Sequence, residues 1–124
     1  MNLNDYFENT QGTGILATAD SEGNVDVAVY ARPHVMDENT VAFIMADRLS
    51  YHNLASNPKA AYLFLESGPG YKGRRLYLSK IKEENDQQKI NSLRRRTSPP
   101  YPVEDSTRHL VHFQVDQVRP ITGD

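Results

Sequence analysis

Apolar residues recur along this chain in short runs that turn-forming residues separate, a pattern typical of β-strands. The clearest alternation covers residues 25–32, where Val25, Val27 and Val29 alternate with other positions and predict a strand with one buried face. Residues 41–46 and 59–66 are apolar runs that predict strands covered on both sides. Three further segments complete a predicted set of six strands, namely 14–19, 76–81 and the stretch that contains Val111, Phe113 and Val115.

The predicted helices are short and largely polar. Residues 3–8 follow an asparagine cap, a helix begins at Ser50 after the third strand, and residues 83–96 form a polar helix. The proline-rich stretch 98–105 cannot be helical. Tight turns favour antiparallel neighbours, and none of these helices is long enough to cover a parallel sheet. We therefore predict a single domain over residues 1–124 with a mainly β fold, a β-barrel with small helices.

The composition narrows the class of protein. The 124 residues carry a net charge of −2, so no excess of positive charge indicates nucleic acid. Cysteine is absent, which excludes disulfides, thiol catalysis and cysteine-ligated metal, and fits a reducing compartment. The N-terminal residues lack the features of a signal peptide, and no apolar run reaches membrane-spanning length. We expect a cytoplasmic protein without a metal site or membrane contact.

A basic, glycine-containing region follows the fourth predicted strand. Residues 71–96 hold nine basic and three acidic side chains, which form a solvated helix face or in part face a bound phosphate. Gly68, Gly70 and Gly73 fit the pattern G-x-G-x-x-G. A dinucleotide-binding fingerprint must open a helix and be followed by a distant acidic residue. These glycines lead into the predicted strand 76–81 instead, and so indicate a hairpin connection.

A short polar segment, RLSYHN at residues 48–53, lies between two apolar strands. Arg48, Ser50 and His52 make it rich in hydrogen-bond donors. The beginning of a helix at Ser50 would add backbone N–H groups and the positive end of the helix dipole, and both favour an anion. Plainer roles stay open, namely a surface ion pair for Arg48, an N-cap for Ser50 and a surface position for His52.

The order of these segments resembles the pyridoxamine 5′-phosphate oxidase-like, FMN-binding split-barrel superfamily. The alternating strand ends near Pro33, and the apolar strand 41–46 and a polar serine-containing loop follow it. The motif NLxxNP at residues 53–58 then runs into the next strand, and the ending HFQVDQVRP fits the superfamily's last strand. The resemblance extends over residues 14–119 and implies a six-stranded antiparallel Greek-key split barrel.

The resemblance also implies a homodimer with one FMN in each of two clefts at the subunit interface. Superfamily members usually hold the FMN phosphate with the loop after the third strand, where this chain has Arg48, Ser50, His52 and Asn53. The loop is shorter than in many relatives, and its usual lysine is either replaced by His52 or lost. If His52 takes that position, phosphate affinity would depend on pH, because histidine titrates near neutrality.

Two further sets of residues are implied as cofactor contacts. The flavin ring should lie along strand edges and be contacted largely through the backbone. Arg32 could stabilise the anionic edge of the reduced flavin, or it could form an ion pair with a carboxylate. The ring contacts predicted from position are Tyr30, Ala31, Arg32, Met45, Ala46 and Asp47. The residues after the glycine loop, which either reach the partner subunit's cofactor or form a flexible basic hairpin, are Tyr71, Lys72, Arg74 and Arg75.

The residues alone assign no reaction. The sequence contains no Ser-His-Asp order, catalytic carboxylate pair or H-E-x-x-H helix. His109 and His112 are three apart in a strand-like segment, face opposite sides and are poor co-ligands for a metal. Three classes of function remain open: an FMN-dependent oxidoreductase of unknown small-molecule substrate, a non-catalytic flavin-binding or electron-carrying protein, and a split-barrel protein that binds deazaflavin or haem.

Overall fold

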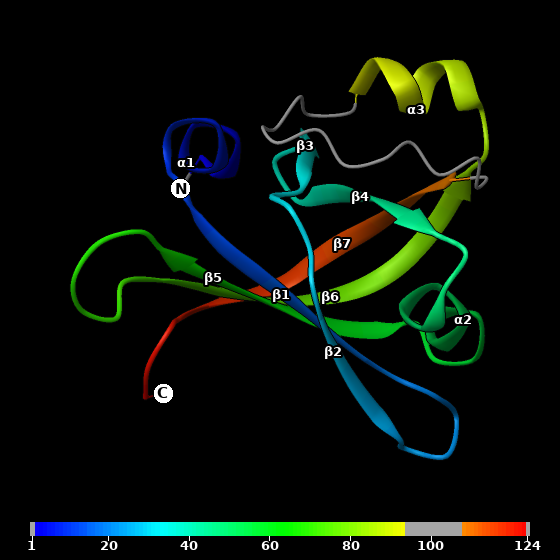
Figure 1. The fold of residues 1–124 in the computed structure, drawn as a ribbon, viewed down its shortest axis with the longest axis horizontal. Coiled ribbons are helices and arrows are strands. Elements are labelled where there is room, and N and C mark those ends of the chain that lie inside the picture. The colour runs from blue at the N-terminus through cyan, green and yellow to red at the C-terminus, as the bar shows by residue number, and fades with distance from the viewer. Residues whose placement is uncertain (1, 94–107, 124) are drawn as a thin grey trace.

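The computed structural model describes residues 2–93 and 108–123 of the chain. In this part of the chain, three short helices accompany seven strands (Figure 1). The helices are α1 (Leu3–Asn9), α2 (Leu49–Ser56) and α3 (Gln87–Leu93). The strands are β1 (Gly12–Ala19), β2 (Val25–Val29), β3 (His34–Asp37), β4 (Thr40–Ala46), β5 (Lys59–Glu66), β6 (Gly73–Glu84) and β7 (Arg108–Pro120).

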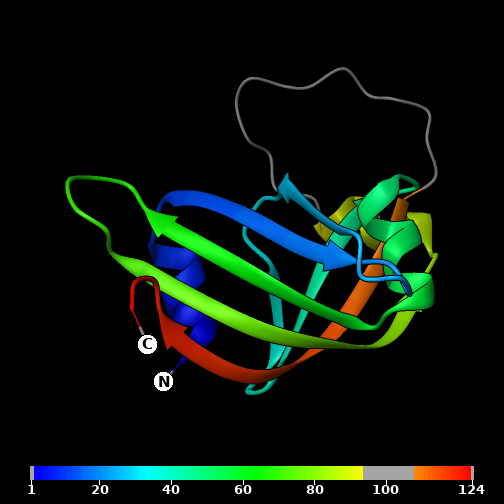
Figure 2. The same cartoon turned by 90° about the horizontal axis from the view of Figure 1, so that it is seen from below.

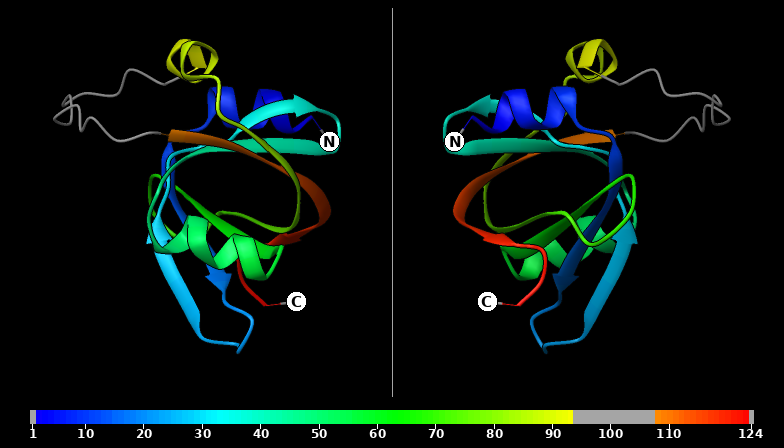
Figure 3. Two further views of the ribbon diagram at one scale, coloured as in Figure 1. Left: turned by 90° about the vertical axis from the view of Figure 1, so that its right-hand side faces the viewer. Right: turned by 90° about the vertical axis from the view of Figure 1, so that its left-hand side faces the viewer.

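One antiparallel sheet contains all of these strands in the order β2-β1-β5-β6-β7-β4-β3. The sheet curls around an interior (Figure 3), and β2 and β3 are its two edges. Within the described residues no ladder joins these edges, so the barrel is open along one line. The predicted mainly β barrel with small helices is confirmed. The short strand β3, which pairs with β4, is an addition that the sequence pattern did not reveal.

Aromatic side chains fill the interior of the barrel. Phe7 of α1 joins Phe43, Tyr62 and Phe64 of the strands, and each of these side chains is at most 2% exposed. The ring centroids of Phe43 and Tyr62 lie 4.9 Å apart, and those of Phe7 and Phe64 lie 5.4 Å apart. Tilted and edge-to-face contacts of this kind stabilise aromatic pairs beyond the burial of their surface. The cluster therefore connects the N-terminal helix to β4 and β5.

Strand β4 is covered on both faces, as its sequence predicts. Val41, Phe43 and Met45 face the aromatic core, and all three are nearly or fully buried. Ala42 faces the other way and contacts a small cluster that includes Ile90 of α3. The second face of this strand is therefore buried within the same chain.

The prediction of a buried valine face on β2 is wrong for the single chain. Val25, Val27 and Val29 are 82%, 67% and 75% exposed. The intervening positions face α2 and the interior, because Asp26 pairs with Thr18 of β1, whose side chain is buried. The alternation correctly marks a strand, but the polar side of this strand faces inward.

The predicted helix 83–96 begins too early. Glu83 and Glu84 belong to β6, where they pair with Val111 and Leu110 of β7, and α3 begins at Gln87. Strand pairing with β7 outweighs the helix propensity of the two glutamates. The predicted proline-rich break 98–105 lies outside the described residues.

Gly14 of β1 allows a close approach between the Tyr62 side chain and the backbone that follows β2. The buried Tyr62 hydroxyl lies 3.1 Å and 3.2 Å from the carbonyl oxygens of Tyr30 and Ala31, to which it donates. A Cβ atom at Gly14 would overlap this hydroxyl and come within 2.5 Å of the Tyr30 carbonyl oxygen. Only glycine leaves room here for the link between β5 and the chain that leaves β2.

We predict that Gly14→Ala lowers the free energy of unfolding by about 1–3 kcal/mol, because the added methyl group forces Tyr62 away from its acceptors. The measurement is urea denaturation followed by circular dichroism. Thr13→Ala, at the exposed preceding position, is the control and should change stability by no more than about 0.5 kcal/mol. Equal effects of the two substitutions would contradict the steric explanation.

Candidate functional site

Helix α2 carries the polar segment that the sequence singles out and packs against β1, β2 and β4. Arg48 is its N-terminal cap residue, and the N–H of His52 donates to the Arg48 carbonyl oxygen at 3.0 Å. The helix begins at Leu49, one residue before the predicted Ser50. The first N–H groups of a helix have no acceptor inside it, and they carry the positive end of the helix dipole. This end of α2 therefore favours a negatively charged group.

Ser50 lies at the centre of a polar cluster beneath α2 and is 4% exposed. Its hydroxyl donates to Oδ2 of Asp26 over a long 3.5 Å and also lies within hydrogen-bonding reach of the Tyr30 hydroxyl. Burial raises the pKa of Tyr30, and the nearby carboxylate of Asp26 adds to the rise. The contact with Ser50 and the positive charges of Arg108 and Arg48 act in the opposite direction. One carboxylate and two guanidinium groups thus act electrostatically on a single phenol.

Arg108 is, with Asp26, a member of this cluster that the sequence does not reveal. It begins β7 and pairs in register with Ala46, the last residue of β4. Arg48 follows the same strand end, where its N–H donates to the Ala46 carbonyl oxygen at 2.8 Å. The pairing of β4 with β7 therefore brings together two arginines that are far apart in sequence. A sheet register of this kind has no local sequence signal.

The next two predicted residues contact other side chains of the chain. His52 is exposed, and its Nε2 lies 2.7 Å from Oδ1 of Asp47. Asn53 is 6% exposed, and its amide group donates to the Thr18 hydroxyl at 3.1 Å. The second contact fastens α2 to β1. Cofactor roles for His52 and Asn53 stay predictions.

The residues predicted along the flavin ring lie at the ends of β2 and β4. The carbonyl oxygens of Tyr30 and Ala31 accept from Tyr62, as described above. Met45 is fully buried in the core, whereas Ala46 is half-buried and Asp47 is exposed. A ligand at this edge would therefore meet the backbone around Ala46 and Asp47 more readily than the Met45 side chain.

Arg32 contacts the end of α1. Its Nη1 donates to the carbonyl oxygens of Phe7 at 2.6 Å and Thr10 at 3.2 Å. A cation at a helix C-terminus satisfies orphan carbonyl groups and complements the helix dipole. This capping role was not among the two alternatives that the sequence suggests for Arg32, and a contact with flavin stays a prediction.

The structure separates the second set of predicted residues from α2. Tyr71 and Lys72 are exposed in the β5–β6 connection, at the end of the sheet opposite α2 (Figures 1 and 2). The Arg74 guanidinium lies 4.2 Å from the centroid of the Tyr6 ring. Arg75 donates to two carbonyl groups near the C-terminus, at 2.7 Å and 2.6 Å. These residues could share a site with α2 only through a second copy of the chain.

Tyr51 fastens α2 to β6 and β7. Its ring stacks on His109, with centroids 4.0 Å apart and planes at 7°. Its hydroxyl donates to Oε2 of Glu83 at 2.6 Å, which is the main reason that the pKa of Tyr51 rises to about 12 and that of Glu83 falls. Lys80 lies 3.2 Å from the other oxygen of Glu83, and His109 Nδ1 lies 2.5 Å from the amide oxygen of Asn85. No sequence pattern predicts this network.

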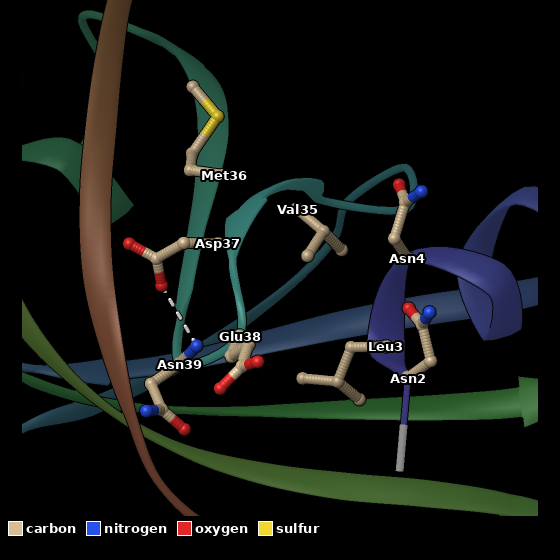
Figure 4. Close-up of a pocket in the computed structure, with 8 residues that line it drawn as sticks. All are labelled: Asn2, Leu3, Asn4, Val35, Met36, Asp37, Glu38 and Asn39. Atoms are coloured by element: carbon tan, nitrogen blue, oxygen red, sulfur yellow. Dashed lines mark hydrogen bonds between the residues drawn. The ribbon is translucent and has the colours of Figure 1, made fainter.

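An open cavity of about 710 Å³ lies between α1 and the β3–β4 hairpin (Figure 4). Its lining includes no residue of the predicted site. The Asp37 carboxylate at its wall accepts from the backbone N–H of Asn39 at 2.9 Å. The cavity is lined by Asn2, Leu3, Asn4, Val35, Met36, Asp37, Glu38 and Asn39.

Two other kinds of site are absent from the part of the chain that the structure describes. No group of three or more histidine, aspartate or glutamate side chains there could hold a metal ion. His112 contacts Glu84 at 2.6 Å, whereas His109 contacts Asn85, so the two histidines do not converge. Among residues 2–93 and 108–123, no helix is long and apolar enough to cross a membrane.

Comparison with known proteins gives one family. A sequence model for the family described as pyridoxamine 5′-phosphate oxidase matches residues 4–122. No curated protein matches the sequence significantly.

Several solved structures share the fold. An FMN-binding protein from Syntrophomonas wolfei has a TM-score of 0.77 and 16% identity, with 98% of this chain and 84% of that chain covered. General stress protein 26 from Bacillus anthracis has a TM-score of 0.69 and 15% identity, with 98% and 95% covered. An F420 reductase has a TM-score of 0.68 and 18% identity, with 93% and 94% covered. At these identities the similarity shows the fold alone.

We predict that Tyr51→Phe lowers the free energy of unfolding by about 1.5 kcal/mol at pH 7, because it removes a hydrogen bond to an ionised carboxylate. The folded pKa of Glu83 is depressed, so this stabilisation is present above the ordinary glutamate pKa of 4.5 and is lost as pH falls through the folded value. The difference between the two proteins should therefore narrow in urea denaturation below about pH 4.

The control for this prediction is Tyr71→Phe, which removes a hydroxyl from a side chain that is 78% exposed. It should leave stability unchanged at every pH. If the difference in free energy of unfolding between wild type and Tyr51→Phe stays constant from pH 7 to about pH 3, the hydrogen bond to Glu83 is not what stabilises the wild type.

Proposed function

Because this chain belongs to the pyridoxamine 5′-phosphate oxidase family, we propose that it binds FMN and acts as a flavin-dependent oxidoreductase on a small molecule. One observation carries this proposal: Arg48 is the N-cap residue of α2, Ser50 lies in the first turn of that helix, and both act on the Tyr30 hydroxyl. The shared fold of the FMN-binding protein from Syntrophomonas wolfei supports the choice of cofactor.

The donor set suits the phosphate group of FMN. A guanidinium group, a hydroxyl and helix N–H groups are the donors that make charge-assisted hydrogen bonds to phosphate oxygens. Arg48 provides the first and Ser50 the second, and Arg108 adds positive charge nearby. The flavin ring would then lie along the strand end at Ala46 and Asp47, where Ala46 is half-buried and Asp47 is exposed.

When bound, FMN would supply the redox chemistry. The residues of the chain would hold and orient it. Arg48 and Arg108 would balance the charge of the phosphate, and Ser50 would fix its position. We assign no catalytic side chain, so the protein's contribution is binding, orientation and the local electric field.

We also propose that two copies of the chain form a homodimer through the outer face of β2, β1 and β5. Directly paired residues share a face of a sheet, so Val29 lies beside Ile15, and Val27 lies beside Ala17. A monomer rarely exposes an apolar face of this kind. This valine face consists of Val25, Val27, Val29, Ile15, Ala17, Ala61 and Leu63.

The valine face is a better candidate interface than the two-sided strand β4, because α3 already covers the outer side of that strand. A dimer would also give Tyr71 and Lys72 a route to the cofactor of the other subunit. In a single chain they lie at the opposite end of the sheet from α2 (Figure 2).

A deazaflavin is the second candidate cofactor, because an F420 reductase shares the fold over 93% of this chain. The absorbance spectrum of the purified protein separates the two, since FMN and deazaflavin absorb at different wavelengths. Bleaching by a nicotinamide nucleotide under anaerobic conditions then separates an oxidoreductase from a protein that only carries flavin. A purified protein that takes up neither cofactor would contradict the proposal.

We predict that Arg48→Ala and Ser50→Ala each weaken FMN binding by about 1.5–3 kcal/mol, which is roughly 10- to 100-fold, because each removes a charge-assisted contact. Riboflavin, which has no phosphate, is the matched ligand and should bind both variants as it binds the wild type. Fluorescence titration measures both affinities. Unchanged FMN affinity in folded variants would place the phosphate elsewhere.

We predict that Val27→Lys converts the dimer to a monomer at micromolar concentration, because it buries a charge in the proposed interface. Sedimentation velocity measures the change. Met36→Lys introduces the same charge on β3, at the other edge of the sheet, where Met36 is 36% exposed, and should leave the dimer intact. A wild-type protein that is monomeric and loaded with FMN would contradict the proposed assembly.

A further inference from the structure

Asp26 places a carboxylate among the donors that are proposed to hold phosphate. It lies on β2 between two exposed valines, and its cross-strand partner is the buried Thr18 of β1. Its position is therefore on the inner side of the strand, where α2 packs. Oδ2 of Asp26 accepts from the Ser50 hydroxyl at 3.5 Å. A phosphate oxygen bound by Ser50 would need the same hydrogen.

The charges around Asp26 are mixed. Arg48 and Arg108 act on the Tyr30 hydroxyl together with Asp26, so all three charged groups lie within electrostatic reach of one point. The neighbouring positions of β1 and α2, Thr18 and Ser50, are uncharged. Asp26 is therefore an anion that contacts the donor set directly through Ser50, whereas the exposed Asp47 contacts His52.

We propose that Asp26 competes with the phosphate of the cofactor and thereby limits the preference of the site for FMN over riboflavin. This inference rests on the proposed function and deepens it. A carboxylate repels a phosphate that carries up to two negative charges, and the repulsion is stronger in a partly buried site than in water. Phosphate must also displace the carboxylate from the Ser50 hydroxyl. Asp26 is thus a specificity-determining residue that acts against the phosphorylated ligand.

Asp26→Asn tests the inference with little change in shape, because asparagine keeps an oxygen that can accept from Ser50. Flavin-free wild type and variant are titrated with FMN and with riboflavin by fluorescence at one fixed ionic strength. The FMN affinity of Asp26→Asn should rise about tenfold, as expected for removal of one charge at this range. The riboflavin affinity should stay within about twofold of wild type.

Glu38→Gln is the matched control. It removes one negative charge from the β3–β4 turn, outside the donor set, and should leave the ratio of FMN to riboflavin affinity unchanged. Inorganic phosphate provides a second measurement, since it should compete with FMN at about tenfold lower concentration in Asp26→Asn than in wild type. If Asp26→Asn does not fold, Asp26→Ser removes the same charge with a smaller side chain.

The outcomes are distinct. An unchanged FMN-to-riboflavin ratio in the variant, with a wild type that prefers FMN, overturns the role of Asp26 and leaves the proposed function standing. A fall in FMN affinity also overturns it, because Asp26 would then orient the donors rather than compete for them. If neither protein prefers FMN to riboflavin, the phosphate site fails, and with it both the proposed function and this inference.

Discussion

The hydroxyl group of Tyr62 is the interaction on which the rest of the structure depends. It lies in an aromatic core, where an unpaired polar group would be costly, and it finds acceptors in the backbone of Tyr30 and Ala31. Gly14 leaves the necessary space. The contact holds the chain at the point where it leaves β2, and so the Tyr30 side chain lies beside Ser50. Core packing and the candidate site therefore share one residue, Tyr30, through its backbone and its side chain respectively.

The sequence predicts which segments are strands better than it predicts which face of each strand lies inside. On β4 both faces are apolar, so the sequence correctly predicts that both are covered. On β2 the pattern marks two chemically different faces, and the usual rule would bury the valines. The rule fails because Asp26 and Tyr30 contact Ser50 of α2. The pattern of residues within one strand carries no information about such a contact with a distant helix. The early start predicted for α3 fails similarly, since pairing with β7 keeps Glu83 and Glu84 in a strand.

The candidate site likewise contains residues that the sequence predicts and residues that only the fold brings together. Arg48 and Ser50 could be found from the sequence because they lie within a few residues of each other, ahead of the motif at residues 53–58. Arg108 and Asp26 could not, because strand register and helix packing bring them there. The stacked pair of Tyr51 and His109 was missed for the same reason. Local motifs thus identify the centre of the site, and distant segments provide the charges that tune it.

The strand order also has a consequence for how the chain assembles as it is made. β4 pairs with β7, the last of the described strands, and β1 pairs with β5 rather than β3. The edge of β4 that pairs with β7 therefore stays unpaired until a strand more than 60 residues later in the sequence has been made. Folding of such a sheet is governed by contacts between distant residues, which makes it slow relative to a helical bundle of the same length. Before β7 pairs with it, β4 exposes unpaired backbone N–H and C=O groups, with which a strand of another chain could pair.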